Sequence, residues 1–164
     1  MNTDRSEKTV LLGASRARVW RAISDAGEFG TWFGVAFDGP FVEHTRLTGR
    51  VVPTQVDAGV AQKQEPHTGV PFEFVVGRIE PMDRISFQWR PFAIEPGVDY
   101  SEEPTTLIVF ELADDDGGVR LTITETGFDR IPIARRAKAF AANDEGWHEQ
   151  SILVERYLAL HADA

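Results

Sequence analysis

Hydrophobic residues near the C-terminus repeat with the spacing of a helix. One broad stripe between residues 143 and 161 collects Trp147, Gln150, Ser151, Leu153, Val154, Tyr157, Leu158 and Leu160. The opposite side carries His148, Glu149, Glu155 and Arg156, with Ile152 as an apolar exception. Asn143, Asp144 and Glu145 supply a capping side chain and negative charge at its start. The pattern predicts a long C-terminal helix over 143–161, with another helical turn or two in 133–142.

The stripe is interrupted by two uncharged polar residues, Gln150 and Ser151, one turn after Trp147. A helix that fills a solid core normally carries Leu or Ile at such positions. Two interpretations remain open. Either a ligand or water lies beneath these side chains, or they are boundary residues that contact solvent or a backbone carbonyl.

The rest of the chain alternates as short strands do. Strands are predicted at 8–12, 47–53, 56–62, 72–79, 84–90, 105–112 and 119–126, with loops at 64–71 and 91–104. The Asp/Gly run at 114–118 predicts a hairpin between the last two. Ser15 is typical of an N-cap before a short helix, and 26–34 predicts a second helical turn that Trp32 and Phe33 close.

These elements predict one domain over residues 1–164, of the α+β class. Strands in hairpin order, with two short helices near the N-terminus and a long helix at the end, favour an antiparallel sheet. The economical arrangement is a curved sheet wrapped around the last helix, with space left between them wherever the side chains are small or polar.

Charge and composition exclude several classes of function. Seventeen Lys and Arg against 26 Asp and Glu give a net charge of −9, which argues against nucleic acid and anionic membrane surfaces as partners. The absence of Cys excludes disulfides, thiolate metal sites and a Cys nucleophile. The polar N-terminal residues and the absence of a long apolar run predict a cytoplasmic protein without membrane insertion.

Several short segments form an ordered set that spans most of the chain. They are VWRAI at 19–23, WFG at 32–34, GR at 49–50, RIEP at 78–81, ISFQW at 85–89, VRLTITETGFD at 119–129, GW at 146–147 and YL at 157–158. The set resembles the START-like (SRPBCC) superfamily, and within it the homologues of the activator of heat-shock protein 90 ATPase, C-terminal-domain group. The resemblance implies a helix-grip fold with a hydrophobic cavity between sheet and helix. The family position four residues after the tryptophan is usually large and apolar; Ser151 there implies a roomier or more polar cavity floor.

With that fold, a set of aromatic and helix residues would face the space under the last helix. The predicted ligand-binding residues are Trp32, Phe74, Phe87, Trp89, Trp147, Gln150, Ser151 and Val154. They would line a pocket of roughly 300–1,000 Å³, with Gln150 and Ser151 orienting a ligand. The alternative is a close-packed core in which the rings fill the volume.

Other chemistry has little support. Glu125 shares a strand face with Leu121 and Ile123 and could act as a general acid or base, although a Glu at a strand end more often reaches solvent or pairs with an Arg. His44, His67, His148 and His161 fit no zinc pattern and are expected on the surface. The sequence therefore predicts no cofactor, no metal site and no assigned catalytic residue.

Three classes of function follow. The first is a binding protein for a small hydrophobic or amphipathic molecule, such as a lipid, polyketide or aromatic metabolite. The second is an enzyme of the cyclase or hydrolase type that uses Glu125, Gln150, Ser151 or Tyr157. The third is a co-chaperone that stimulates a heat-shock ATPase. It is disfavoured because the eukaryotic activators carry an additional N-terminal domain for which this chain has no room, and because the acidic balance offers no complementary patch.

Overall fold

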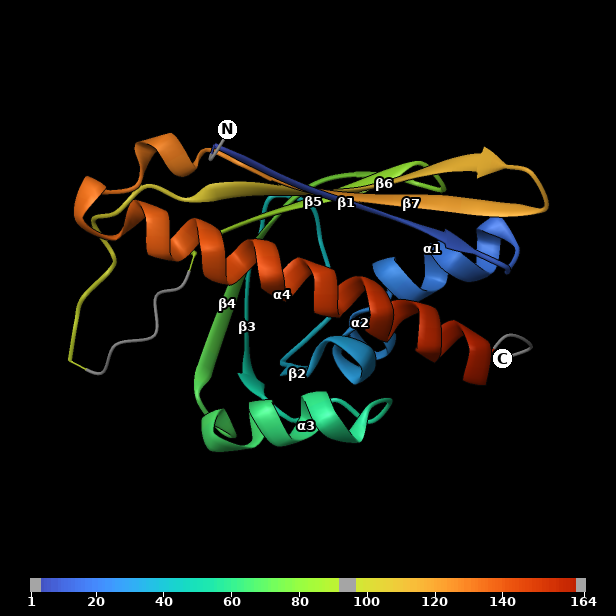
Figure 1. Ribbon diagram of the computed structural model, residues 1–164, viewed down its shortest axis with the longest axis horizontal. Coiled ribbons are helices and arrows are strands. Elements are labelled where there is room, and N and C mark those ends of the chain that lie inside the picture. Colours follow the sequence, from blue (N-terminus) through green and yellow to red (C-terminus); the bar gives the residue numbers. More distant parts are fainter. Residues whose placement is uncertain (1–3, 92–96, 162–164) are drawn as a thin grey trace.

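The computed structural model describes residues 4–91 and 97–161. These residues form a seven-stranded antiparallel sheet in the order β1-β7-β6-β5-β4-β3-β2, and the long helix α4 (Ile133–Leu160) lies across one face of it (Figure 1). The strands are β1 (Arg5–Leu12), β2 (Val35–Phe37), β3 (Arg46–Val51), β4 (Pro71–Glu80), β5 (Arg84–Trp89), β6 (Thr106–Asp115) and β7 (Gly118–Thr126). The shorter helices are α1 (Arg16–Ser24), α2 (Ala26–Phe33) and α3 (Ala58–Gln64), with 3₁₀ turns η1 (Glu65–His67) and η2 (Phe128–Arg130). The predicted α+β helix-grip fold is confirmed.

Local sequence signals account for the elements that the pattern predicted correctly. Ser15 caps α1 by accepting a hydrogen bond from the Arg18 amide at 3.1 Å, and Asp25 caps α2 through the Glu28 amide at 2.9 Å. The predicted hairpin is β6–β7, in which Asp115 faces Gly118 across a two-residue turn. The strand β2 was not predicted, because three residues are too few to show alternation. Residues 92–96 of the predicted loop at 91–104 lie outside the described residues.

The predicted strand at 56–62 is wrong, because this segment contains α3. Asp57 accepts a hydrogen bond from the Val60 amide at 2.9 Å and so caps the helix. Val56 and Val60 pack against the core while Ala58 is exposed. Val56 lies just before the N-cap and Val60 lies in the first turn of α3, so the alternation through Ala58 does not mark a strand.

The helical turns predicted in 133–142 are confirmed, but they belong to the C-terminal helix itself, so its predicted start at residue 143 is wrong. The helix begins ten residues earlier, at Ile133 after Pro132, because 133–142 is rich in alanine and contains no breaker. Its added turns are anchored by the buried Ala139 and by Phe140, whose ring lies 5.2 Å from that of Phe128. Asn143 consequently lies in the middle of α4 rather than at its cap.

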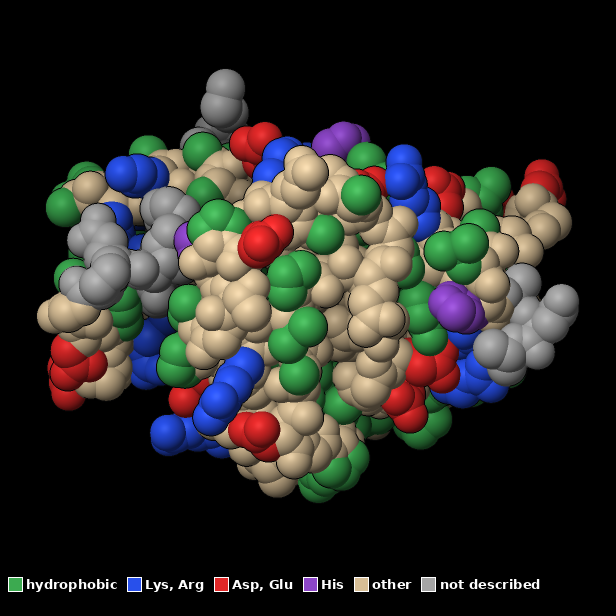
Figure 2. Space-filling view, turned by 90° about the horizontal axis from the view of Figure 1, so that it is seen from below, with side chains coloured by type: hydrophobic (Ala, Val, Ile, Leu, Met, Phe, Trp, Pro, Cys, Tyr) green, Lys and Arg blue, Asp and Glu red, His purple; other side chains and the backbone are tan. Residues whose placement is uncertain are grey.

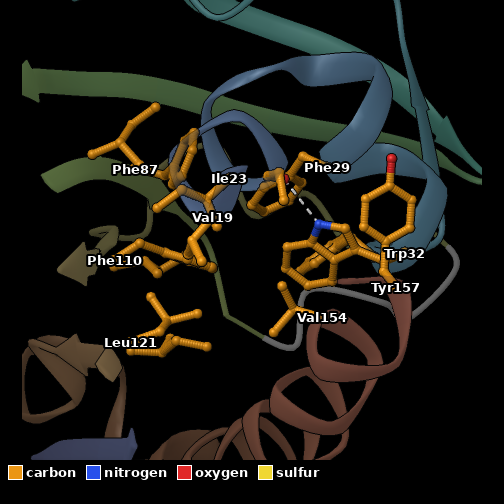
Figure 3. Packing of buried hydrophobic residues seen from close by; sticks show 14 of the residues in the cluster. Val19, Ile23, Phe29, Trp32, Phe87, Phe110, Leu121, Val154 and Tyr157 are labelled. Carbon is orange, nitrogen blue, oxygen red and sulfur yellow. Dashed lines mark hydrogen bonds between the residues drawn. The ribbon is translucent and has the colours of Figure 1, made fainter. Parts of the chain in front are cut away.

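The core between sheet and helices is built mainly from aromatic rings. Phe29 of α2 contacts Trp32 of the same helix at 4.6 Å and Phe110 of β6 at 5.5 Å between ring centroids. Figure 3 shows Trp32 between Phe29 and the α4 residues Val154 and Tyr157. Its indole N–H donates to the carbonyl of Ala22 at 3.0 Å, so the polar atom of this buried ring is satisfied.

A partly buried ionic cluster joins α1, α2 and the C-terminal end of α4. The Arg18 guanidinium lies 2.8 Å from Glu28 and 5.5 Å from the centre of the Tyr157 ring, and its Nε donates to the carbonyl of His161 at 2.8 Å. Glu28 also pairs with Arg21 at 2.6 Å and accepts the Tyr157 hydroxyl at 2.8 Å. Burial opposes ionisation of Glu28, but the hydrogen bonds from Tyr157 and Arg18 and the two arginine charges outweigh it and lower the pKa of Glu28.

This cluster predicts part of the acid sensitivity of the fold. The pKa of Glu28 is lower in the folded protein than its ordinary value of 4.5. Ionised Glu28 therefore stabilises the folded state at pH values above 4.5, and this contribution is lost as the pH falls through the folded pKa. Urea unfolding of Glu28→Gln at successive pH values below about 5 should therefore show a shallower loss of stability than the parent. Parallel curves for the two proteins would contradict the assignment.

No helix in the described part of the chain combines the length and apolarity needed to cross a membrane.

Candidate functional site

A cavity of about 780 Å³ lies where the middle turns of α4 face the ends of β4 and β5. Its walls come from the C-terminal end of α2, from α3, from β4 and β5, from residues 100–105 and from α4. The apolar wall consists of Phe33, Val35, Val51, Val60, Val70, Pro71, Phe72, Val75, Trp89 and Ala142. Polar groups are interspersed with these, chiefly Gln64, Gln88, Tyr100, Asn143 and Gln150.

A smaller chamber of about 80 Å³ adjoins this cavity under α4. Its lining residues are Phe33, Trp89, Ala142, Asn143, Gly146, Trp147 and Gln150. All except Trp147 also line the larger cavity. We call this space the inner chamber and the larger one the outer chamber. Gly146 leaves room at their junction, since a Cβ added there would meet nothing within 4 Å.

Glu125 of β7 holds the wall of the inner chamber together. One carboxyl oxygen accepts from the Trp147 indole at 2.8 Å and from the Asn143 amide at 3.0 Å. The other accepts from the Trp89 indole at 2.6 Å and from the Thr106 hydroxyl. The residue is fully buried, and within the described residues its hydrogen-bond partners are all neutral donors. The expectation that Glu125 reaches solvent or pairs with an Arg is therefore wrong.

Glu125 lies inside because β7 alternates strictly. Val119, Leu121, Ile123 and Glu125 all occupy the inward positions of the strand, which run to its end. Asn143 and Trp147 are one helical turn apart on α4, so both can reach the same carboxyl group. The four-residue spacing of Asn143 and Trp147 is visible in the sequence, but a helix that starts at residue 143 makes Asn143 a capping residue instead.

The carbonyl of Phe33 joins three helices at the other side of the chamber. It accepts the side-chain amide of Gln64 from α3 and that of Gln150 from α4, each at 3.1 Å. Gly34 ends α2 in the left-handed conformation, with φ 102°, and this leaves the carbonyl groups of the last turn available. The two glutamines thus supply the donors that the helix end lacks.

Charged groups border the outer chamber. Lys63 of α3 lies 2.6 Å from Glu149 of α4, whose hydrogen bond and charge raise the pKa of the lysine. Arg90 is held by backbone carbonyls, donating to Ser101 at 2.9 Å and to Glu103 at 3.1 Å. The face of the molecule that is seen from below relative to Figure 1 mixes basic, acidic and apolar side chains (Figure 2).

Three of the predicted ligand-binding residues border the chambers. Trp89 and Gln150 line both, and Trp147 lines the inner one. The other five lie in the packed core between sheet and helix. These are Trp32, Phe74, Phe87, Ser151 and Val154. Ser151 lines neither of the two chambers, and its hydroxyl donates to the carbonyl of His148 at 2.7 Å. The two chambers lie about one turn closer to the start of α4 than the cavity floor that was predicted under Ser151.

Sequence reasoning did not find the other residues at the chambers. Asn143 and Gly146 lie at helical spacing before the predicted Gln150 on α4, which could have indicated a common face. Gln64 and Lys63 could not be found, because their segment was read as a strand and loop.

The groups suggested for catalysis are mostly engaged in structural hydrogen bonds. Gln150 alone among them lines a chamber, whereas Glu125, Ser151 and Tyr157 are buried and bonded within the protein. The four histidines are exposed as predicted, and His67 borders the outer chamber. Among the residues that the structure describes, no cluster of His, Asp and Glu could hold a metal ion.

The sequence matches the family described as activator of Hsp90 ATPase homolog 1-like protein over residues 13–158. This chain belongs to that family. The match covers every element from α1 to the last turns of α4, and the resemblance inferred from the short segments is confirmed.

Solved structures share the fold of this family member. A protein from Arthrobacter aurescens has a TM-score of 0.73 and 18% identity, covering 99% of this chain and 91% of that chain. MLL2253 from Mesorhizobium loti has a TM-score of 0.69 and 15% identity, covering 96% and 98%. DynU16, a protein in the dynemicin biosynthetic locus, has a TM-score of 0.66 and 21% identity, covering 95% of this chain and 47% of that chain. No curated protein matches the sequence. The START-like fold of the family supports a hydrophobic ligand-binding domain.

Proposed function

We propose that the protein binds a small amphipathic molecule in the outer and inner chambers. The observation that carries this proposal is the cavity itself. A volume of about 780 Å³ is within the range of small-molecule sites, and its wall combines aromatic and aliphatic side chains with a few polar groups. The apolar part of the ligand would lie against Phe33, Phe72 and Trp89, and the amides of α3 and α4 would orient its polar part.

The chamber walls are held in place before a ligand arrives. Glu125 fixes both indoles and Asn143, and the Phe33 carbonyl fixes Gln64 and Gln150. A wall that is ordered in advance lowers the entropy that binding has to overcome. This supports a binding role, and the structural engagement of Glu125, Ser151 and Tyr157 gives the enzyme alternative no added support. A lipid, polyketide or aromatic metabolite would each suit these dimensions.

Gly146 provides the test. Gly146→Phe should fill the junction of the chambers and weaken binding of the neutral apolar fluorophore N-phenyl-1-naphthylamine at least tenfold, because the added ring would occupy the ligand volume. Gly146→Ala is the matched control. It should retain binding and raise the free energy of unfolding by about 0.5–1 kcal/mol, since alanine favours the helix over glycine. Fluorescence titration and urea unfolding measure the two effects.

The proposal fails if the fluorophore binds the parent and Gly146→Phe equally, since binding would then lie elsewhere. It fails also if neither the fluorophore nor any member of a panel of fatty acids, polyketides and aromatic acids binds the parent or raises its melting temperature.

A further inference from the structure

The carboxylates and ammonium group that line the outer chamber are paired, whereas the guanidinium group of Arg90 is not. Lys63 pairs with Glu149 at 2.6 Å, and Glu73 pairs with Arg46 at 3.1 Å. Arg90 lines the same chamber, and no carboxylate in the described part of the chain forms an ion pair with it. The chamber wall therefore carries one positive charge that the described side chains around it leave unbalanced.

Acidic residues of the neighbouring loop have other partners. Arg90 donates to the backbone carbonyl of Glu103, but the Glu103 carboxylate is held by Arg135 of α4, whose Nε donates to it at 2.9 Å. Asp99 accepts from the Ser101 amide at 2.9 Å. Its hydrogen bonds with Ser101 and, to a smaller extent, the charge of Arg90 lower the pKa of Asp99, without an ion pair between the two side chains. These contacts leave the guanidinium group for an anion from outside the chain.

Arg90 is held in place and still has unused donors. Its Nε donates to the Glu103 carbonyl at 3.1 Å and its Nη2 to the Ser101 carbonyl at 2.9 Å. A guanidinium group carries five N–H bonds, so three remain, two of them on Nη1. Nη1 has no hydrogen-bond partner among the described residues and is not buried away from solvent. The planar group can therefore donate to both oxygens of a carboxylate.

An apolar surface begins directly beside this charge. Trp89 precedes Arg90 at the end of β5, and both line the outer chamber. The Trp89 ring lies 5.8 Å from that of Phe72, which lies 5.8 Å from that of Phe33. A ligand whose charged group contacts Arg90 can thus lay an apolar body along these three rings within the same cavity.

We infer that Arg90 binds the carboxylate of an amphipathic monocarboxylic acid whose apolar body occupies the outer chamber. This inference rests on the proposed binding function and specifies its ligand class. A single negative charge matches the single unbalanced guanidinium group. The second charge of a phosphate monoester would face Glu73 and Glu149 on the same wall, which disfavours that head group.

Four ligands with the same ten-carbon chain and different head groups test the inference. Their affinities are measured at pH 7 by displacement of N-phenyl-1-naphthylamine. Decanoate should bind about tenfold more tightly than decanol, because only the carboxylate forms charge-assisted hydrogen bonds with Arg90. Decylamine should bind more weakly than decanol, and decyl phosphate no more tightly than decanoate.

Substitution of Arg90 separates recognition of the carboxylate from support of the loop. Arg90→Gln should lower the affinity for decanoate about tenfold and change that for decanol and the fluorophore less than twofold. Arg90→Lys should give an intermediate affinity for decanoate, since it keeps the charge and loses the planar fork. Arg78→Gln is the matched control, because it removes the same charge from an arginine that is 73% exposed and lies outside the chamber lining. It should leave decanoate binding unchanged within twofold.

Several results would overturn the inference. Unchanged decanoate binding in Arg90→Gln would remove Arg90 from the site, and equal losses of decanoate, decanol and fluorophore would reduce its role to holding the loop. Decanol or decylamine binding the parent as tightly as decanoate would overturn the head-group assignment and leave the proposed function standing. Tighter binding of decyl phosphate would replace the carboxylate by a phosphate. Failure of all four ligands, together with the fluorophore, would count against the proposed function itself.

Discussion

Glu125→Gln is expected to lower the free energy of unfolding by about 3 kcal/mol, although the two side chains have nearly the same shape. In the parent, both carboxyl oxygens accept from donors, and all of these donors are buried with the carboxyl group or partly buried. An amide has one oxygen, and its NH₂ group would face an indole N–H or the Asn143 amide. At least one buried donor would then lose its acceptor while two donors are forced together.

Urea unfolding measures this loss as a shift of the midpoint at unchanged m-value. Glu111→Gln is the matched control, because Glu111 lies on the neighbouring strand β6 with about half of its side chain exposed and pairs with Arg84 at 3.5 Å. It should change stability by less than about 0.5 kcal/mol. If Glu125→Gln were as stable as this control, the carboxyl group would not organise the chamber wall.

Trp32→Ala is expected to cost about 4 kcal/mol, which is typical of deleting a fully buried aromatic side chain. The indole contacts Phe29, Phe33 and Phe110, and the cavity left behind would be enclosed by residues of the core. Trp32→Phe retains a ring but loses the hydrogen bond to the Ala22 carbonyl, so its cost should be about 1–2 kcal/mol.

Thermal and urea unfolding of the two variants separate packing from hydrogen bonding at this position. If Trp32→Ala lowered the free energy of unfolding by less than about 1 kcal/mol, the ring would not be part of the stabilising core, and its predicted role as a ligand contact would be favoured again. Equal losses in both variants would mean that the hydrogen bond, not the packed ring, stabilises the fold.

The fold could be predicted because its main elements are regular. The β6–β7 hairpin alternates cleanly around its Asp/Gly turn, Ser15 marks the start of α1, and the stripe from Trp147 to Leu158 buries one face of α4. These signals are local, so they can be read without knowledge of the tertiary structure.

The site was only partly predictable because it depends on contacts between distant segments. Gln150 and Ser151 look alike as polar residues on an apolar stripe, yet Gln150 lines the chambers and Ser151 bonds to its own helix. A hydroxyl can satisfy itself on a nearby carbonyl of the same helix, whereas the longer amide has to find a partner elsewhere. The burial of Glu125 likewise depends on hydrogen-bond donors from β5, β6 and α4. Because these elements are far apart in the sequence, no local pattern predicts that they meet.

The position of β1 in the sheet has a consequence for how the protein folds. This strand pairs along its whole length with β7, from Arg5 opposite Thr126 to Leu12 opposite Val119. More than a hundred residues therefore separate partners that must meet before the sheet is complete. Such long-range pairing slows folding, and on the ribosome the first strand must wait, unpaired, until β7 has emerged.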